Sequence, residues 1–452
     1  MMERSLRNGG GERRMGWRWA VALVLIAGGA AGCDSIFEVD NPNDLVQEDL
    51  EQPTASTALV NGAEATVARG LADIVLAISV PSDELTWRGT YDAGRELDVG
   101  FLLNPANEFS NAQAWGTFAM GRFMADEAVR LMERWQAEGT LRDPSHLARA
   151  YLYSAITYVA AADYWDSYVI SDRHEAAPPI PEDEMYKLYD IAIERLGKGL
   201  EVAREIGDRN LQAAILGMRA RAHFAKAIWH KLNPPGATPA DPLVNDAAAA
   251  TDAIAALDLV EGDWKYQFRY GPTTVSNQLG GWINARQEFR VDTAYAVPNE
   301  AGQRVVAVAL LDPIDRVPDA ALHGALVELG AFAATTEEYP PFTVVSAREL
   351  HLIAAEVALA NGSEADAAAH INAVRALDRR TPYTGQVPLL DLLKHERRVN
   401  LFLQGRRLAD MYRFGIKDPR WQPTSDAATR PGTFFPIADE EIKRNCHVSR
   451  TC

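Results

Sequence analysis

The chain has 452 residues, with 45 lysines and arginines against 62 aspartates and glutamates, and a formal net charge of −17. Hydrophobic residues make up 47% and charged residues 24%, a composition that excludes a disordered chain, a collagen-like repeat and a polytopic membrane protein. The acidic balance argues against a nucleic-acid binder, because phosphate recognition requires a basic surface. Three cysteines are too few for a disulfide scaffold. The length by itself suggests two to three domains.

The first 32 residues have the pattern of a secretory signal peptide. They hold five arginines and two glutamates, and an uninterrupted run of apolar or small residues occupies 20–32. A basic start, a short apolar core and a small-residue exit are typical of a segment that is cleaved after export. The run is shorter than the roughly 20 apolar residues that span a membrane. We therefore expect residues 1–32 to be removed.

Cys33 directly follows this segment and is a predicted lipidation site. The preceding Ala30-Ala31-Gly32 resembles a bacterial lipobox, with alanine at position 30 where leucine is usual. Two acyl chains on the thiol, at about 0.8 kcal/mol per buried CH₂, would anchor the protein stably to a bilayer. The acidic, aperiodic stretch 33–53 is then a tether. A plain signal peptide with a chance cysteine is the alternative.

The rest of the chain is mostly of helical character. Long segments rich in Ala, Leu, Glu and Arg exceed the length of ordinary strands and favour helices. These segments lie near 55–78, 112–138, 145–165, 184–206, 210–232, 245–257, 346–361, 363–379 and 388–413. The acidic run 182–184 is expected to open one of them, because negative charge is favourable at a helix N-terminus.

The clearest helical hairpin is predicted at 346–379. Asn361-Gly362 ends the first helix as a C-cap glycine would, and Ser363 is a candidate N-cap for the second. Short connections and an apolar face on each helix are typical of a tetratricopeptide-like pair. We predict an all-α fold of such hairpins over 54–257 and 346–452, with a loop-rich insertion at 258–345. Within the insertion, 303–311 is the best strand candidate.

Catalytic signatures are missing from the sequence. There is no GxSxG, P-loop, HExxH or CxxC motif, and His351 with Glu356 is better explained as part of a helix of the predicted hairpin. We predict a protein that is not an enzyme and has neither a cofactor nor a metal site. Two carboxylates brought together by the fold, as in a glycoside hydrolase, remain an alternative that the sequence does not single out.

Residues 389–415, LLDLLKHERRVNLFLQGRRLADMYRFG, resemble the C-terminal signature of the SusD/RagB family. Ten residues fit it in register: Glu396, Arg397, Arg398, Leu401, Leu403, Gly405, Arg407, Asp410, Arg413 and Gly415. The sequence departs from the signature at Asn400, Gln404 and Leu408. The segments 346–362, 369–377 and 435–445 are similar to further family elements, and 82–84 to a weaker one.

The resemblance implies a nutrient-binding lipoprotein of the outer membrane. Family members act as a lid on a TonB-dependent transporter and deliver oligosaccharides or other nutrients to it. The implied partners are therefore this transporter, a nutrient and the membrane. Nucleic acid is not among them. The alternative is a lipoprotein scaffold that uses its tetratricopeptide-like grooves for protein assembly only.

The signature residues themselves are expected to stabilise the fold rather than to contact the ligand. Glu396 falls on an apolar helical stripe, and a buried glutamate requires a cationic partner. Arg397, Arg407 and Arg413 are the nearby candidates, Asp410 lies among them, and Gly405 permits a break or a close helix approach.

Ligand contacts are expected from aromatic side chains in loop-like sequence, because their rings stack on the apolar faces of sugars. Two clusters fit this description: Trp87, Arg88, Tyr91 and Asp92, and Trp264, Tyr266, Tyr270 and Trp282. The alternative is that these rings belong to the core. The pairs Tyr164-Trp165 and Trp229-His230 end helical patterns and are expected to pack.

The two remaining cysteines lie close together near the end of the sequence. Cys446 and Cys452 are six positions apart, and in an exported protein a disulfide between them is plausible. Two free thiols are the alternative.

Overall fold

The computed structural model describes residues 50–171, 176–334 and 337–450. The predicted signal peptide, Cys33 and nearly all of the tether lie outside the described residues, and so does Cys452. Cleavage, lipidation and the disulfide therefore stay predictions. From Gln52 onward the chain forms one compact unit. Among the described residues, no helix has the length and apolar character needed to cross a membrane.

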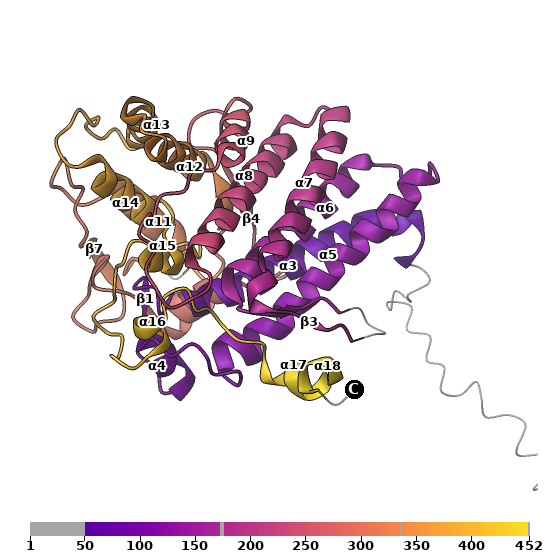
Figure 1. The fold of residues 1–452 in the computed structure, drawn as a ribbon, viewed down its shortest axis with the longest axis horizontal. Helices are drawn as coiled ribbons and strands as arrows, with labels where there is room; N and C mark the ends of the chain where they lie inside the picture. Colours follow the sequence, from indigo (N-terminus) through magenta and orange to yellow (C-terminus); the bar gives the residue numbers. More distant parts are fainter. Residues whose placement is uncertain (1–49, 172–175, 335–336, 451–452) are drawn as a thin grey trace, which may run out of the picture. The chain divides into compact units, whose positions relative to one another are not determined.

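The N-terminal half is a succession of long helices in which each packs against the next (Figure 1). They are α3 (Ser56–Ile78), α5 (Ala114–Ala137), α6 (Pro144–Tyr164), α7 (Tyr186–Glu205), α8 (Arg209–Leu232) and α9 (Ala247–Leu257). The short helix η1 (Pro53–Ala55) precedes α3, and three more lie between the long helices: α4 (Asp92–Asp98), η2 (Glu108–Gln113) and η3 (Glu182–Glu184). The helical segments predicted here are therefore present, and the acidic run forms its own turn before α7.

Side-chain caps explain where several helices begin. The Asp208 carboxylate accepts from the Leu211 amide at 2.9 Å at the start of α8, and Asp143, followed by a proline, caps α6. These bonds satisfy amides that have no partner within the helix. At the predicted cap Ser363 the hydroxyl instead donates to the Asp366 carboxylate at 2.6 Å.

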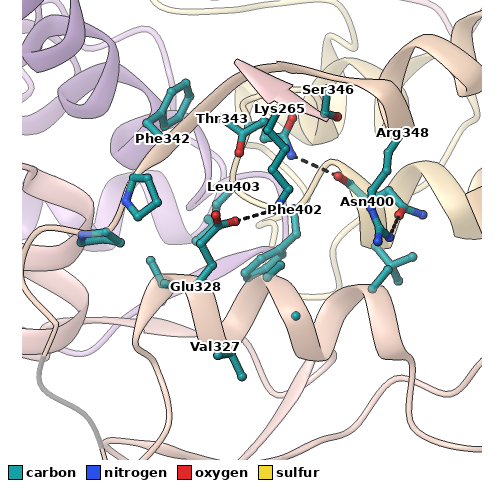
Figure 2. A pocket seen from close by; sticks show the side chains of 18 of the residues that line it. Lys265, Val327, Glu328, Phe342, Thr343, Ser346, Arg348, Asn400, Phe402 and Leu403 are labelled. Carbon is teal, nitrogen blue, oxygen red and sulfur yellow. Dashed lines mark hydrogen bonds and ion pairs between the residues drawn. The ribbon is translucent and has the colours of Figure 1, made fainter. Parts of the chain in front are cut away.

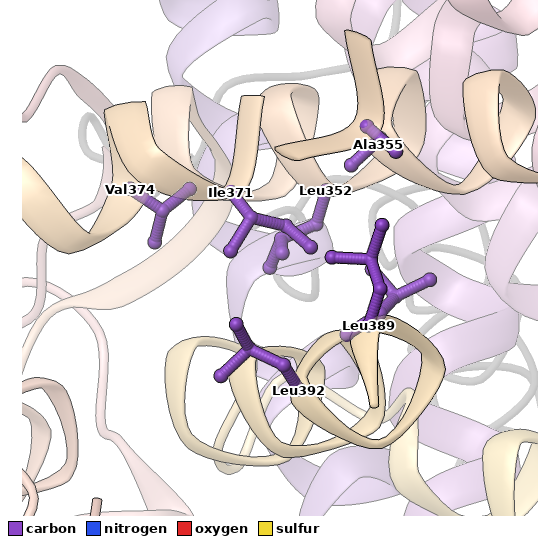
Figure 3. Close-up of a cluster of buried hydrophobic side chains, with 8 residues drawn as sticks. Leu352, Ala355, Ile371, Val374, Leu389 and Leu392 are labelled. Carbon is purple, nitrogen blue, oxygen red and sulfur yellow. The ribbon is translucent and has the colours of Figure 1, made fainter. Parts of the chain in front are cut away.

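The predicted C-terminal hairpin consists of α12 (Ala347–Ala360) and α13 (Glu364–Leu377), and α14 (Leu389–Asn400) packs beside it. Figure 3 shows the apolar side chains that these three helices share. The cluster contains Leu352, Ala355, Ala367, Ile371, Val374, Leu389, Leu392 and Leu393. The other face of α12 is buried as well, because α8 and α9 contact it. This helix therefore joins the two helical regions.

The helix predicted at 388–413 is broken in the structure. It ends at Asn400, and the chain turns through Leu403 and Gly405, both at positive φ, before α15 (Arg407–Arg413). A Cβ on Gly405 would lie 2.1 Å from the Tyr164 hydroxyl oxygen. Glycine is therefore required here both by the left-handed backbone and by the close approach of α6.

The insertion is more ordered than its sequence suggests. It contains α10 (Gln278–Gly280), η4 (Gly281–Arg286), α11 (Ala320–Leu329) and the strands β4 (Lys265–Phe268), β5 (Phe289–Val291), β6 (Ala296–Pro298) and β7 (Val305–Val308). The predicted strand at 303–311 is present as β7. Helix α11 was not predicted, because its ten residues lie between prolines.

Small antiparallel strand pairs order the insertion, and one of them joins it to the N-terminal helical region. β1 (Leu85–Trp87) pairs with β5, β4 pairs with β8 (Phe342–Ser346), and β6 pairs with β7. A fourth pair, β2 (Tyr168–Val169) with β3 (Pro179–Ile180), follows α6, and α16 (Asp426–Thr429), α17 (Asp439–Arg444) and α18 (Cys446–Ser449) complete the described chain. The predicted all-α class is confirmed in its main feature, with two-stranded sheets as additions.

Candidate ligand-binding site

Five aromatic rings from three separate parts of the chain meet in one aromatic cluster. It contains Trp87, Tyr91, Phe109, Trp282 and Phe289. The β1–β5 ladder places Trp87 opposite Phe289, with ring centroids 4.7 Å apart. Phe109 and Trp282 both come from single π-helical turns, which are frequent at functional sites. The structure thus unites members of the two clusters that the sequence treated separately.

Two glycines make room for the central ring of this cluster. A Cβ on Gly94 would lie 2.4 Å from the Trp87 ring, and one on Gly89 would lie 2.3 Å from it. The Trp87 amide donates to the Asp98 carboxylate at 3.1 Å. Trp87 and Trp282 are buried. These two rings therefore form the base of the aromatic cluster, and other side chains form its solvent-exposed surface.

The exposed part of the cluster is Tyr91, a residue that is 41% exposed. The Arg286 guanidinium lies 3.9 Å from the Trp282 ring centroid and pairs with Glu288 at 2.9 Å. The bond to Glu288, followed by one to Tyr91, raises the pKa of Arg286. Arg88 and Asp92 are exposed nearby in sequence. We call Tyr91, Arg88, Asp92, Arg286 and Glu288 the Tyr91 platform.

The other predicted aromatic residues do not join the aromatic cluster. Trp264 donates its indole N–H to Asn210 at 2.8 Å, and the Tyr270 hydroxyl donates to the Ala68 carbonyl at 2.8 Å. The Tyr266 hydroxyl lies 3.4 Å from that of Tyr153, and burial raises the pKa of Tyr266 to about 12. The polar ends of these three side chains thus bond to α8, α6 and α3. Their role in ligand binding stays a prediction.

A separate cavity of about 280 Å³ lies between α11, the β4–β8 pair and the turn after α14. Figure 2 shows the Glu328 carboxylate beside Lys265 and Arg348 beside Asn400, with Phe402 between the two pairs. The Lys265 ammonium pairs with Glu328 at 2.9 Å, and Arg348 donates to Asn400 at 2.8 Å. These charged groups of the cavity therefore pair with one another, as Arg286 and Glu288 do on the Tyr91 platform.

The signature residues form a buried ion-pair network. Arg413 pairs with Glu356 of α12 and donates to Asp410 at 2.9 Å, and Arg397 donates to the other Asp410 oxygen at 2.9 Å. Arg407 pairs with Asp83 at 2.8 Å. The expected structural role fits this arrangement, since a buried charge is tolerated only when it is paired.

The partner of Glu396 differs from the prediction. Its carboxylate accepts from Arg375 of α13 at 2.8 Å and from Asn400 at 3.0 Å. The three predicted arginines are directed to other carboxylates, so predicting Arg397, Arg407 or Arg413 was wrong. Sequence proximity could not reveal this contact, because it depends on how α13 packs against α14.

Arg375 also explains a group of potential metal ligands. Asp312, Asp319 and His395 have ligand atoms within 4.8 Å of one another. Arg375 donates to Asp312 at 2.8 Å, and Asp319 caps α11 while lying 2.8 Å from His395. The negative charge is thus compensated by side chains of the protein itself. His351 contacts His370 at 3.0 Å rather than Glu356.

The weak family element at 82–84 binds the signature directly. The buried Glu84 carboxylate accepts from the Leu403 amide at 2.8 Å and from Ser82 at 3.2 Å. Burial raises the pKa of Glu84 to about 7. Because the protonated form is favoured in the folded state, this stabilisation is complete below pH 4.5 and is lost as pH rises through 7.

We therefore expect Glu84→Gln to remove a pH dependence. The amide keeps an acceptor for Leu403 but does not ionise, so the variant should gain up to about 3 kcal/mol relative to the wild type between pH 5 and pH 8. Denaturant unfolding of both proteins across this range measures the difference, and other titrating groups cancel in it. A pH-independent difference would contradict the assignment.

Comparisons with known proteins agree with this architecture. Residues 348–451 match the model of the SusD family, and no curated protein matches the chain. A SusD superfamily protein from Bacteroides vulgatus has a TM-score of 0.60 at 14% identity, covering 87% of this chain and 97% of its own. A SusD homolog from Bacteroides thetaiotaomicron has a TM-score of 0.59 at 13% identity, covering 87% and 96%.

A third structure is described as a SusD-like carbohydrate binding protein from Bacteroides vulgatus. It has a TM-score of 0.54 at 12% identity and covers 80% of this chain and 83% of its own. At these identities the solved structures establish the fold, while the family model identifies the C-terminal signature. Together, these findings show a SusD-family C-terminal segment at 348–451 and a fold like that of SusD superfamily structures over most of the chain.

Proposed function

We propose that this protein is a cell-surface lipoprotein that binds an oligosaccharide at the Tyr91 platform and works with a TonB-dependent outer-membrane transporter. The match of residues 348–451 to the SusD family supports this, as does structural similarity to a SusD-like carbohydrate binding protein. Lipidation of Cys33 would hold it at the outer membrane. In this proposal the ligand is bound and handed on, and no bond in it is broken.

The observation that carries the proposal is an exposed aromatic ring on a rigid base. Tyr91 contacts Trp87 and Phe109 at centroid distances of 6.2 Å, so its position is fixed by buried neighbours. A sugar can stack its C–H face on such a ring, while Arg286, Glu288 and Asp92 offer donors and acceptors to its hydroxyl groups. Few and well-placed polar groups beside an apolar surface are typical of ligand sites.

Tyr91→Ala is expected to weaken oligosaccharide binding at least tenfold, a loss of about 1.4 kcal/mol, because the stacking surface is removed. Tyr91→Phe keeps the ring and should stay within about threefold of the wild type. Isothermal titration with soluble malto-, cello-, xylo- and manno-oligosaccharides measures both. Equal affinity of the alanine variant and the wild type would contradict the location of the site.

The partner and the anchor are tested separately from the ligand. The wild type should co-purify with a large outer-membrane barrel protein and incorporate radiolabelled palmitate, and Cys33→Ser should abolish the label. The scaffold alternative predicts co-purification without affinity for any nutrient. Release of shorter sugars from a bound oligosaccharide would overturn the proposal that the protein is not an enzyme.

A further inference from the structure

A second open hollow lies where the N-terminus of α7 meets the C-terminus of α8. Its volume is about 690 Å³, within the range of roughly 300–1,000 Å³ typical of ligand pockets. Tyr186, Trp229 and His230 line it, together with the chain at 233–235. We call it the Trp229 hollow. None of its residues belongs to the Tyr91 platform or to the cavity beside α11.

The three rings of the Trp229 hollow contact one another but remain open to solvent. Trp229 lies 5.4 Å from Tyr186 and 5.1 Å from His230, measured between ring centroids. His230 is exposed, and the other two rings are half-buried. Trp229 and His230 were expected to pack, and their rings pack against one another and against Tyr186. Exposed apolar surface gathered in a concave place marks binding sites more often than isolated exposed rings do.

The walls of the hollow carry polar groups of both signs. Arg430 pairs with Glu182 at 2.9 Å, and both side chains are more than a third exposed. Asp183 is exposed beside them. The Asn233 side chain donates to the Trp229 carbonyl at 3.0 Å, and its amide oxygen adds an acceptor. Because positive and negative side chains lie side by side in this wall, a strongly charged ligand would meet a group of its own sign. A neutral ligand rich in hydroxyl groups can bond to both kinds of group.

We propose that the Trp229 hollow is a second saccharide-binding site that takes a short neutral oligosaccharide. The proposal rests on the proposed function, since both sites would serve the same class of ligand. The volume exceeds what a single small polar group would require, and three adjacent rings offer stacking surfaces to more than one sugar unit.

Proline-rich peptides also bind aromatic grooves, but the ring geometry favours a saccharide here. Peptides in the polyproline conformation dock into grooves lined by aromatic side chains. In the Trp229 hollow the ring planes meet at 40°, 53° and 84°, so they face different directions. The Arg430–Glu182 pair adds a donor and an acceptor at the rim, which vicinal hydroxyl groups match.

The test uses the full-length protein in a Tyr91→Ala background, where binding at the Tyr91 platform is weakened. Isothermal titration with tetra- to hexasaccharides of the malto, cello, xylo and manno series should show residual binding. Trp229→Ala combined with His230→Ala should weaken this residual binding at least tenfold. Trp229→Phe, which keeps an aromatic face, should stay within about threefold. Circular dichroism checks that every variant is folded.

The outcomes separate this inference from the proposed function. Both proposals are supported if each wild-type chain binds two oligosaccharides, if Tyr91→Ala removes one of these binding events, and if Trp229→Ala with His230→Ala removes the other. A single event that Tyr91→Ala abolishes and the hollow variants leave unchanged overturns the second site only. Absence of binding to every sugar overturns both. Binding of a decaproline peptide at the hollow, without saccharide binding there, replaces the saccharide with a peptide and overturns the inference.

Discussion

Arg413→Ala is expected to lower the free energy of unfolding by about 3–5 kcal/mol, the largest effect among single charge deletions considered for this fold. Arg413 is fully buried and donates to Glu356, Asp410 and the Pro242 carbonyl. Its removal leaves two buried carboxylates with weakened compensation, because Arg397 is then their remaining close cation. Urea denaturation followed by circular dichroism measures the loss.

An exposed ion pair provides the matched control for Arg413. Arg95 pairs with Asp92 at 2.6 Å, with both side chains largely in solvent, and Arg95→Ala should cost less than about 1 kcal/mol. The Arg413 variant, where still folded, should bind sugar as the wild type does. A stable Arg413→Ala protein that has lost binding would show that the signature contacts the ligand and would refute its structural role.

Gly405→Ala is expected to destabilise the protein by about 3 kcal/mol or more. Two costs combine: an L-residue at φ 75° is strained, at about 1–2 kcal/mol, and the new Cβ would meet the Tyr164 hydroxyl oxygen at 2.1 Å. Overpacking of this kind costs about 1–3 kcal/mol. The measurement is the shift of the urea midpoint with the slope unchanged.

Gly139 separates the two costs of the Gly405 substitution. It also has a positive φ, of 68°, but a Cβ there would meet nothing within 4 Å. Gly139→Ala should therefore show only the backbone strain, about 1–2 kcal/mol. Equal losses at the two positions would mean that the contact with Tyr164 relaxes freely. Tyr164→Phe in the Gly405→Ala background should recover part of the difference.

The helices were predictable because the signal for them is local. Apolar spacing and the Asn361-Gly362 stop define the α12–α13 hairpin within a few residues. The segment was predicted as one helix to residue 413, because helix-forming residues continue through it and only Gly405 was recognised as permitting a break. The cause is tertiary, since α6 and the Glu84 carboxylate occupy the space that a continued helix would need.

The residue types of the candidate site could be predicted from the sequence, but which of these residues meet in space could be predicted less well. Trp87, Tyr91 and Trp282 were all recognised as loop aromatics, yet their meeting depends on the β1–β5 pairing of strands about two hundred residues apart. No short-range pattern encodes that pairing. Trp229 and His230 were assigned to packing, because a sequence cannot show that two neighbouring helix ends leave a hollow between them.

The contact of Glu84 with Leu403, and that of Asp83 with Arg407, span 319 and 324 positions of the chain. Contacts of such long sequence separation form late, because a large loop must close before they gain any energy. The buried carboxylate of Glu84 lacks its amide donor until synthesis has reached residue 403 of 452. For a chain that the proposed signal peptide would export, this order of events keeps the fold incomplete while the polypeptide still has to thread through a translocation channel.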